Sequence, residues 1–166
     1  MSRKIIGIMA CTNKGVIGLN GAIPWRYPEE FLHFKNTTDG QIVVMGRRTF
    51  DELANLDLLS SRDNIVFTQN KSLLKSKMAE NIRFISSLEE FEKLTLNPDK
   101  KIYMIGGAKI VELFLKNDMI DEFLLTKIHK EYDGDTYFPL DLMKNWDSEC
   151  VDTREGYSIY SYKHKN

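Results

Sequence analysis

The sequence has few cysteines, no long apolar run and almost no excess of charge of either sign. With two cysteines, Cys11 and Cys150, the chain cannot build a disulfide framework, so a reduced, cytoplasmic setting is expected. No apolar run approaches the roughly 18 residues that cross a bilayer, and residues 1–6 lack the apolar region and cleavage site of a signal peptide. A net charge of −1 gives no reason to expect nucleic acid or a membrane as a partner.

The sequence also lacks the motifs that usually mark catalytic groups. Its three histidines, His33, His129 and His164, are far apart and match no metal-ligand spacing, so no metal site is expected. No serine or cysteine lies in a nucleophile motif, and neither a GxGxxG fingerprint nor a GxxxxGKS/T loop is present. Any chemistry is therefore expected to come from a bound cofactor that the protein positions.

What is present is typical of one globular domain over residues 1–166. Hydrophobic residues make up 42% and charged residues 28% of the chain, and no repeat or linker divides it. Short apolar runs alternate with helical segments, which predicts right-handed crossovers, a mainly parallel sheet and an α/β fold. The predicted strands lie at residues 4–11, 41–45, 64–68, 81–85, 101–105 and 121–130, and the predicted helices begin near residues 28, 47, 87 and 108.

The remaining segments are predicted to be loops and one antiparallel strand. Residues 12–22 contain three glycines and two asparagines, which predicts a mobile loop without an element of its own. Residues 134–139 are likewise predicted to form a loop. The alternation of residues 157–162 predicts an antiparallel edge strand or the partner strand of a hairpin.

The helix that begins at Pro28 carries a carboxylate beside aromatic side chains. Proline suits the first helical position, and acidic residues suit the first turn. At about 100° per residue, Glu30 shares one face with Phe31 and Phe34, whereas Glu29 points toward solvent. Glu30 therefore either complements the helix dipole or is a partly buried carboxylate that holds a cationic or amide-rich ring.

Two predicted strands end in glycine and pass directly into a helix. In residues 46–49 the glycine precedes two arginines and a threonine, a combination that suits phosphate because helix starts offer free amide hydrogens and arginine adds bidentate contacts. In residues 106–108 two glycines precede an alanine. Each segment alone could be an ordinary turn, but the pair favours a dinucleotide. Ligands of parallel sheets bind beyond the carboxyl ends of the strands, so both turns are expected near Glu30.

Short segments spread over the whole chain match one known pattern in order: Val16-Ile17-Gly18, Pro24-Trp25, Pro28-Glu29-Glu30-Phe31, Phe34-Lys35, Val44-Met45-Gly46-Arg47, Arg62-Asp63-Asn64, Ile105-Gly106-Gly107, Gly134-Asp135-Thr136 and Phe138-Pro139. This ordered set resembles the dihydrofolate reductase family. The resemblance implies a single-domain α/β fold with about eight strands, an antiparallel C-terminal edge and about four helices. It also implies NADPH-dependent reduction of 7,8-dihydrofolate to 5,6,7,8-tetrahydrofolate in one-carbon metabolism, by a monomer that antifolates inhibit.

The resemblance implies that one acidic side chain anchors the pterin ring. Glu30 would bind the ring N3–H and the 2-amino group, Thr126 would hydrogen-bond the Glu30 carboxylate, and Trp25 would hold a water nearby. Hydride would reach C6, and a proton from solvent would reach N5. The other implied substrate contacts are the backbone carbonyls of Ile8 and Ile105, the side chain of Ala10, the ring wall of Phe31, Phe34 and Leu59, and the tail-binding Arg62.

The resemblance places the cofactor along the glycine-rich segments. Residues 15–22 would close over the nicotinamide as a lid, and the Gly106–Gly107 peptide bond is expected to be cis, as in the family. The implied nicotinamide contacts are Ala10, Ile17, Gly18 and Leu19. The implied contacts to the rest of the cofactor are Gly46, Arg47, Arg48, Thr49, Thr68, Gln69, Gly106, Gly107, Ala108, Lys109 and Ile110.

Three positions depart from the family pattern. Residues 54–61 are longer than in a common bacterial form, so either Leu58 or Leu59 could line the pocket. Val111 replaces a frequent tyrosine near the nicotinamide, and Gln69 replaces a small hydroxyl residue near the 2′-phosphate.

Two other functions stay open. One is a related reductase that acts on another pterin-like or pyrimidine-like ring, such as a riboflavin-pathway reductase. The other is a non-catalytic nucleotide-binding module. The aromatic face beside Glu30, together with Arg62, favours a folate-like ligand with a carboxylate tail.

Overall fold

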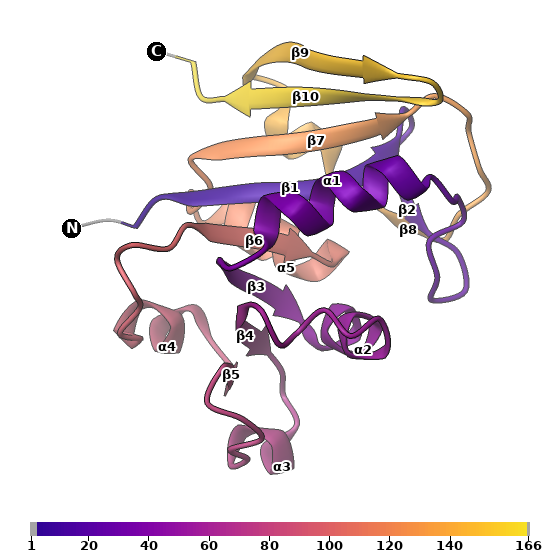
Figure 1. Ribbon diagram of the computed structural model, residues 1–166. Coiled ribbons are helices and arrows are strands. Elements are labelled where there is room, and N and C mark those ends of the chain that lie inside the picture. The colour runs from indigo at the N-terminus through magenta and orange to yellow at the C-terminus, as the bar shows by residue number, and fades with distance from the viewer. Residues whose placement is uncertain (1–2, 166) are drawn as a thin grey trace.

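An eight-stranded, mainly parallel sheet forms the centre of the protein (Figure 1). The computed structural model describes residues 3–165, so the prediction about residues 1–6 lies partly outside the described residues. The strand order is β5-β4-β3-β6-β1-β7-β10-β9, and β10 is antiparallel to both of its neighbours. The strands of this sheet are β1 (Ile5–Thr12), β3 (Ile42–Gly46), β4 (Asp63–Phe67), β5 (Ile82–Ile85), β6 (Ile102–Gly106), β7 (Glu122–Ile128), β9 (Asp147–Arg154) and β10 (Tyr157–Lys163).

Two apolar clusters separate the sheet from helices on its two faces. One cluster contains Phe91 and Phe114. The other cluster contains Phe50, and Phe34 packs against this second cluster. Alternate residues of β3 belong to different clusters, so the clusters lie on opposite faces of the sheet. No helix within residues 3–165 is long and apolar enough to cross a membrane. The helices are α1 (Pro28–Thr38), α2 (Arg47–Asn55), α3 (Lys71–Leu74), α4 (Leu88–Lys93), α5 (Ala108–Lys116) and the 3₁₀-helix η1 (Leu140–Met143).

The α/β fold and its main elements are confirmed. The six strands that the apolar runs predict each begin one residue from the predicted start, and α5 has the predicted bounds. Two of these strands, β4 and β5, stand at one end of the sheet, and β1 and β6 stand near its middle. The short α3 and η1 were not predicted, because four residues are too few to show a helical period.

The prediction that residues 12–22 form a loop without an element of its own is wrong. Residues Val16–Gly18 form β2, which pairs with β8 (Thr136–Tyr137), so the predicted 134–139 loop also contains a strand. The backbone groups of Leu19 and Ala22 bond each other across Asn20 and Gly21, which both have positive φ. Asn-Gly at such a position favours a tight hairpin turn. Asn20 and Gly21 therefore form a tight turn within the segment that the sequence predicted to be an irregular loop.

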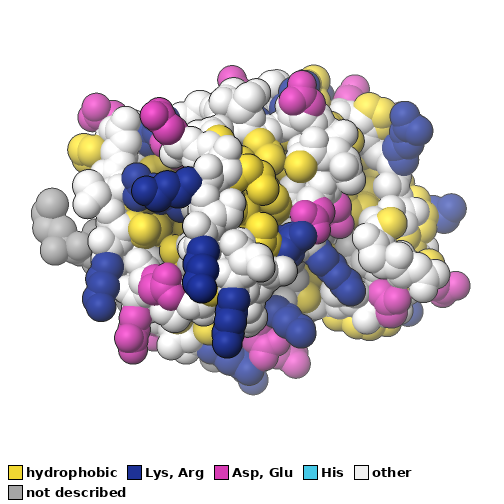
Figure 2. Space-filling model, turned by 90° about the horizontal axis from the view of Figure 1, so that it is seen from below, with side chains coloured by type: hydrophobic (Ala, Val, Ile, Leu, Met, Phe, Trp, Pro, Cys, Tyr) yellow, Lys and Arg dark blue, Asp and Glu magenta, His cyan; other side chains and the backbone are white. Residues whose placement is uncertain are grey.

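The prediction for residues 157–162 is confirmed in its second form, because β10 is a hairpin partner and not the edge. The edge strand is β9, which the sequence did not reveal. Nearly all of its side chains are exposed, so it has no apolar alternation. At the opposite edge, the face seen from the β5 side carries apolar side chains in its middle with Lys and Arg side chains around them (Figure 2).

The middle of the sheet opens at the carboxyl ends of β1 and β6. These two strands pair from Ile5 and Ile102 as far as Gly7 and Met104, and β1 then continues to Thr12 beside β7 only. The chain also changes direction here, since β3, β4 and β5 extend the sheet to one side and β7, β10 and β9 extend it to the other. Ligands of open α/β sheets bind in the crevice at such a reversal.

Candidate active site

The carboxyl group of Glu30 lies in the first turn of α1, in surroundings that disfavour its charge. Pro28 begins the helix and Tyr27 provides no side-chain cap. Burial raises the pKa of Glu30 to about 7, whereas Glu29 is exposed. Glu30 makes no hydrogen bond to another described residue. A carboxylate that served only the helix dipole would be held ionised, so the buried-carboxylate interpretation of Glu30 fits better than dipole complementation.

Four residues of the predicted ring pocket come together beside the opening in the sheet. Ile8 and Ile105 directly follow the last paired residues of β1 and β6, so their backbone groups are outside the β1–β6 ladder. Their side chains belong to one apolar cluster, and Phe34 and Leu59 pack against it. Phe31, which is 39% exposed, lies with its ring centre 6.4 Å from that of Phe34. A flat ring that enters between these groups meets apolar walls and backbone polar atoms.

Trp25, Ala10 and Thr126 share the face of the sheet that α1 covers. Ala10 of β1 stands opposite Thr126 of β7, and Thr126 stands opposite Ile159 of β10. Ala10 and Ile159 both pack with Trp25, which is 8% exposed. The implied hydrogen bond between Thr126 and Glu30 does not form among the described residues. The structure therefore places the three side chains on one face without joining Thr126 to the carboxylate.

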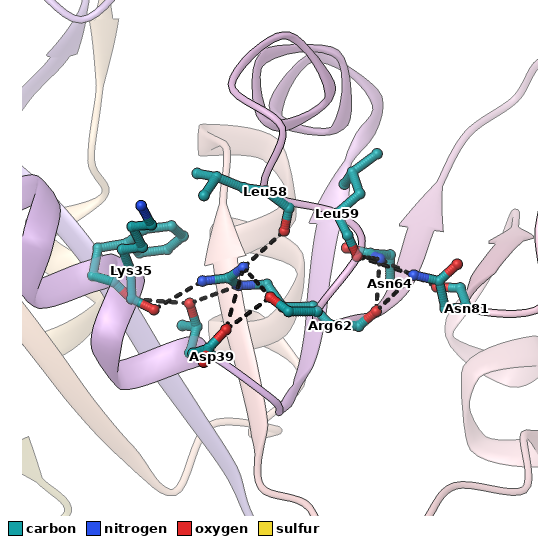
Figure 3. Close-up of polar contacts among 10 residues, drawn as sticks. Lys35, Asp39, Leu58, Leu59, Arg62, Asn64 and Asn81 are labelled. Carbon is teal, nitrogen blue, oxygen red and sulfur yellow. Dashed lines mark hydrogen bonds and ion pairs between the residues drawn. The ribbon is translucent and has the colours of Figure 1, made fainter.

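Most of the hydrogen-bond donors of the Arg62 guanidinium are bonded to other residues of the protein (Figure 3). Its side chain is 2% exposed, and its Nε donates to Thr38 Oγ1 at 3.1 Å. Nη1 donates to the Leu58 carbonyl at 2.8 Å and to Ser61 Oγ at 3.0 Å, and Nη2 donates to the Lys35 carbonyl at 2.8 Å. Burial lowers the pKa of Arg62, partly offset by Asp39. With five N–H donors on a guanidinium, these four bonds leave one donor on Nη2.

Of the two leucines before Arg62, Leu59 has the surface that a ligand could touch. Leu58 is 5% exposed and belongs to the apolar cluster, whereas Leu59 is half-buried. The longer segment 54–61 is absorbed by a turn after α2, in which Asp57 has a φ of 56°.

The two glycine turns lie next to each other at the carboxyl edge of the sheet. A Cβ added to Gly46 would lie 3.0 Å from the Ile110 side chain, and one added to Gly107 would lie 3.8 Å from Thr49 Oγ1. Gly46 and Gly107 are the N-cap residues of α2 and α5, neither of which has a side-chain cap bond. The predicted cis peptide bond between Gly106 and Gly107 is confirmed. Two helix starts with free amide hydrogens and no side chain in the way fit a diphosphate group.

The basic side chains of α2 are exposed at this edge. Arg47 pairs with Asp51 at 3.1 Å on the same helix, and Arg48 and Lys109 are also exposed. An exposed ion pair of this kind is worth little, so it does not prevent Arg47 from turning toward a phosphate.

Thr68 and Gln69 follow β4 at the same edge. Thr68 is 8% exposed, and its hydroxyl accepts the Asn70 amide hydrogen at 3.1 Å. The side-chain amide of Gln69 donates to the Ser86 carbonyl at 3.2 Å. Val111 is fully buried in the core.

The predicted lid, residues 15–22, is tied to residues 134–137. The amide of Asn20 donates to Asp135 Oδ2 at 3.0 Å, and the amide of Asp135 donates to the Gly18 carbonyl at 2.9 Å. The Asn20 amide, followed by the Thr136 hydroxyl, lowers the pKa of Asp135. Ile17 packs against the first apolar cluster together with Met9 and Ile110.

The sequence did not identify the polar groups that support Arg62. Neither the bond from Arg62 to Thr38 Oγ1 nor the bond to the Lys35 carbonyl was predicted. A backbone acceptor has no signature in the sequence.

A reversal of strand order, a pair of glycine-headed helices and a buried carboxylate are together typical of α/β enzymes that bind a dinucleotide beside a ring-shaped substrate. A family model described as dihydrofolate reductase matches residues 4–164. The chain therefore belongs to the dihydrofolate reductase family. It is an oxidoreductase of the class that reduces dihydrofolate to tetrahydrofolate with a nicotinamide cofactor.

Comparison with individual proteins agrees with this assignment. The chain is 32% identical over 149 residues to the dihydrofolate reductase of Staphylococcus haemolyticus, covering 90% of this chain and 84% of that protein. It is 34% identical over 135 residues to the Lactococcus lactis dihydrofolate reductase, covering 81% and 77%. It is 30% identical over 169 aligned positions to the Bacillus subtilis dihydrofolate reductase, covering 96% and 94%.

Proposed function

We propose that the protein uses NADPH to reduce 7,8-dihydrofolate, with Glu30 as the group that makes the pterin ring reactive. The observation that carries this proposal is the half-buried Glu30 side chain in the first turn of α1, on the helix that also carries Phe31 and Phe34. Burial raises the pKa of Glu30 to about 7, and no cation among the described residues offsets it. A cationic ring that hydrogen-bonds such a carboxyl would stabilise its ionised form. Bound NADPH supplies the hydride that reaches C6.

Glu30 is proposed to hold the pterin N3–H and 2-amino group, and its charge stabilises the ring when N5 carries a proton. The N5 proton comes from solvent, since residues 3–165 place no second carboxylic acid among the proposed pterin contacts. Thr126 and a water near Trp25 would orient the carboxylate. The residues of the lid exclude water from the closed site, which strengthens the attraction between carboxylate and ring.

The rest of the substrate would lie along α1. The carbonyls of Ile8 and Ile105 would accept from the pterin edge, while Phe31, Phe34 and Leu59 enclose the aminobenzoyl ring. The free Nη2 donor of Arg62 would bind a carboxylate of the glutamate tail.

The starts of α2 and α5 are proposed to hold the NADPH phosphates. Gly46, Gly106, Gly107 and Ala108 would give the pyrophosphate close access to amide hydrogens. The other proposed cofactor contacts are Arg47, Arg48, Thr49, Thr68, Gln69, Lys109 and Ile110 toward the phosphates and adenosine, and Ala10, Ile17, Gly18 and Leu19 toward the nicotinamide.

We further propose that the protein acts as a cytoplasmic monomer of one domain. The free thiols of Cys11 and Cys150 support a reducing setting. Exposed basic residues beside β5, such as Lys77 and Arg83, and the mostly exposed, charged β9 disfavour edge-to-edge pairing of two sheets.

The test is a spectrophotometric assay of NADPH oxidation with dihydrofolate. The protein should oxidise NADPH only when dihydrofolate is added, and an antifolate should block the reaction. A riboflavin-pathway intermediate in place of dihydrofolate is the comparison substrate. Oxidation with that compound alone would favour the related reductase, and binding of NADPH without turnover would favour the nucleotide-binding module.

A further inference from the structure

Two asparagine side chains hold the turn that carries Leu59 and Arg62 (Figure 3). The Arg62 amide donates to the Leu59 carbonyl at 3.2 Å, which closes residues 59–62 into a β-turn. The Asn64 side-chain amide donates to the Leu59 carbonyl at 2.9 Å and to the Arg62 carbonyl at 3.0 Å. The Asn81 side-chain amide donates to the same two carbonyls, each at 3.0 Å.

These four bonds join the side-chain amides of Asn64 and Asn81 to the carbonyls of Leu59 and Arg62, and the four groups form a square at the base of the turn. A side-chain NH₂ group offers two hydrogens, and a carbonyl oxygen offers two lone pairs. The two side-chain amides supply both donors to the Arg62 carbonyl, and they share the Leu59 carbonyl with the Arg62 backbone amide. Asn64 Nδ2 also lies 3.2 Å from the Asn81 carbonyl. If the Asn81 amide is removed, each of the two carbonyls loses one donor and the Arg62 carbonyl keeps only Asn64, so the spacing between the two ends of the turn is no longer fixed from both sides.

The two asparagines differ in how the fold uses them. Asn64 is a residue of β4 and is 1% exposed, so its side chain is part of the core. Asn81 precedes β5, is more exposed, and reaches the turn from a segment about 20 residues further along the chain. Its own backbone carbonyl accepts the Asn64 amide hydrogen at 2.8 Å, a bond that does not depend on the Asn81 side chain. Truncation of Asn81 therefore spares the pairing of β4 with β5.

The turn sets where the Arg62 guanidinium points. Two of the four bonds of that guanidinium go to the Leu58 carbonyl and to Ser61 Oγ, which move with the turn. Leu59 lies at the other end of the turn and packs against the apolar cluster. The distance between an apolar ring wall and the one free donor of Arg62 is thus fixed by the square.

We propose that Asn81 is a positioning residue for a carboxylate tail on the substrate. This inference rests on the proposed function. Asn81 acts through the backbone carbonyls of Leu59 and Arg62, to which its side chain donates. Substrates that join a ring to a carboxylate need the spacing that the turn fixes, whereas a dihydropterin without a tail does not.

The experiment compares dihydrofolate with a tail-less dihydropterin as substrates of the unmutated protein and of Asn81→Ala. In Asn81→Ala, KM for dihydrofolate should rise by roughly three- to tenfold, the size of one weakened hydrogen bond. The value of kcat and the KM for the tail-less substrate should stay unchanged. Asn81→Asp, which turns a donor into a charged acceptor facing two carbonyl oxygens, should show a larger rise in the same KM alone.

Asn117→Ala is the matched control, because the Asn117 side chain donates to the Leu113 carbonyl at 2.8 Å on an exposed helix end. It should leave both KM values unchanged. If Asn81→Ala fails to fold, Asn81→Ser provides the comparison. Equal changes with both substrates, or no change with either, would overturn the proposal for Asn81 while leaving the activity intact. Absence of turnover by the unmutated protein would instead overturn the proposed function, and with it this inference.

Discussion

At the scale of single residues, Glu30 is a carboxyl group whose burial disfavours its charged form. Its folded pKa of about 7 lies above the ordinary value of 4.5. Between these two values the folded protein binds a proton that the unfolded chain has released. The free energy of unfolding of the ligand-free protein therefore falls as the pH rises through this interval.

Glu30→Gln should remove this pH dependence. In the absence of ligands, the variant should be more stable than the unmutated protein at pH 8, by up to about 3 kcal/mol, because no charge has to be buried. Below pH 4.5 the two proteins should be nearly equal in stability. The measurement is thermal or urea unfolding as a function of pH. A variant that is less stable at pH 8 would return Glu30 to the role of a helix-dipole partner.

The same substitution should nearly abolish the chemical step. Glu30→Gln keeps the shape of the side chain but cannot stabilise a ring protonated at N5, so hydride transfer should fall by orders of magnitude near neutral pH. NADPH affinity should hardly change, and activity should partly return at acidic pH. Single-turnover hydride transfer against pH measures this, with the exposed Glu29→Gln as the control. Near-normal transfer at pH 7 in Glu30→Gln would contradict the proposed role.

Residue types were easier to predict than residue contacts. The sequence predicted that Glu30 shares a face of α1 with Phe34, because a period of 3.6 residues brings them together, but it left open whether the carboxylate is buried. It could not predict that four bonds hold Arg62, since the acceptors include the backbone carbonyls of Lys35 and Leu58. These acceptors belong to segments that meet only in the folded chain.

At the scale of elements, the start of α2 is expected to decide between the two nicotinamide cofactors. Arg47→Ala should weaken NADPH binding by roughly 10- to 100-fold, the value of one charged hydrogen bond, and leave NADH binding almost unchanged. KM values for both cofactors measure this. The control is Arg154→Ala, which removes an exposed arginine paired with Asp152 on β9. Equal use of NADH and NADPH by the unmutated protein would contradict the expected role.

The contact between the lid and residues 134–137 is expected to govern turnover. Asp135→Ala removes the acceptor for the Asn20 amide but leaves the backbone bond to Gly18. The closed lid should become less populated, so kcat should fall while KM for dihydrofolate changes little. Stopped-flow measurement of hydride transfer and product release tests this, with the exposed Asp133→Ala as the control. Unchanged rates for both steps would exclude a gating role for this contact.

Elements with an apolar period were predictable, and those without one were not. β3 and β6 are continuous apolar runs, so their existence and type followed from the sequence. β9 is almost wholly exposed, and β2 and β8 are too short to show a period. The β2–β8 pair exists because residues 16–18 and 136–137 meet in space, which no local pattern encodes.

At the scale of the whole molecule, the two cysteines differ in their exposure to solvent. Cys11 is fully buried in the centre of the sheet, and burial raises its pKa to about 12, whereas Cys150 is exposed on β9. A thiol reagent should therefore modify Cys150 rapidly and Cys11 only after the sheet opens. Counting the modified thiols over time, with Cys150→Ser to isolate Cys11, measures this. Rapid modification of Cys11 in the native protein would contradict the buried position.

The central place of β1 has a consequence for the synthesis of the chain. β1 leaves the ribosome well before its partners β6 and β7, because 116 residues separate the ends of β1 and β7. At 5–20 residues per second, the strand waits roughly 6 to 23 s for its second neighbour. During that time an apolar segment with unpaired backbone groups is available to chaperones or to other nascent chains. The strand that positions the ring pocket is thus exposed to nascent-chain quality control until β6 and β7 have been made.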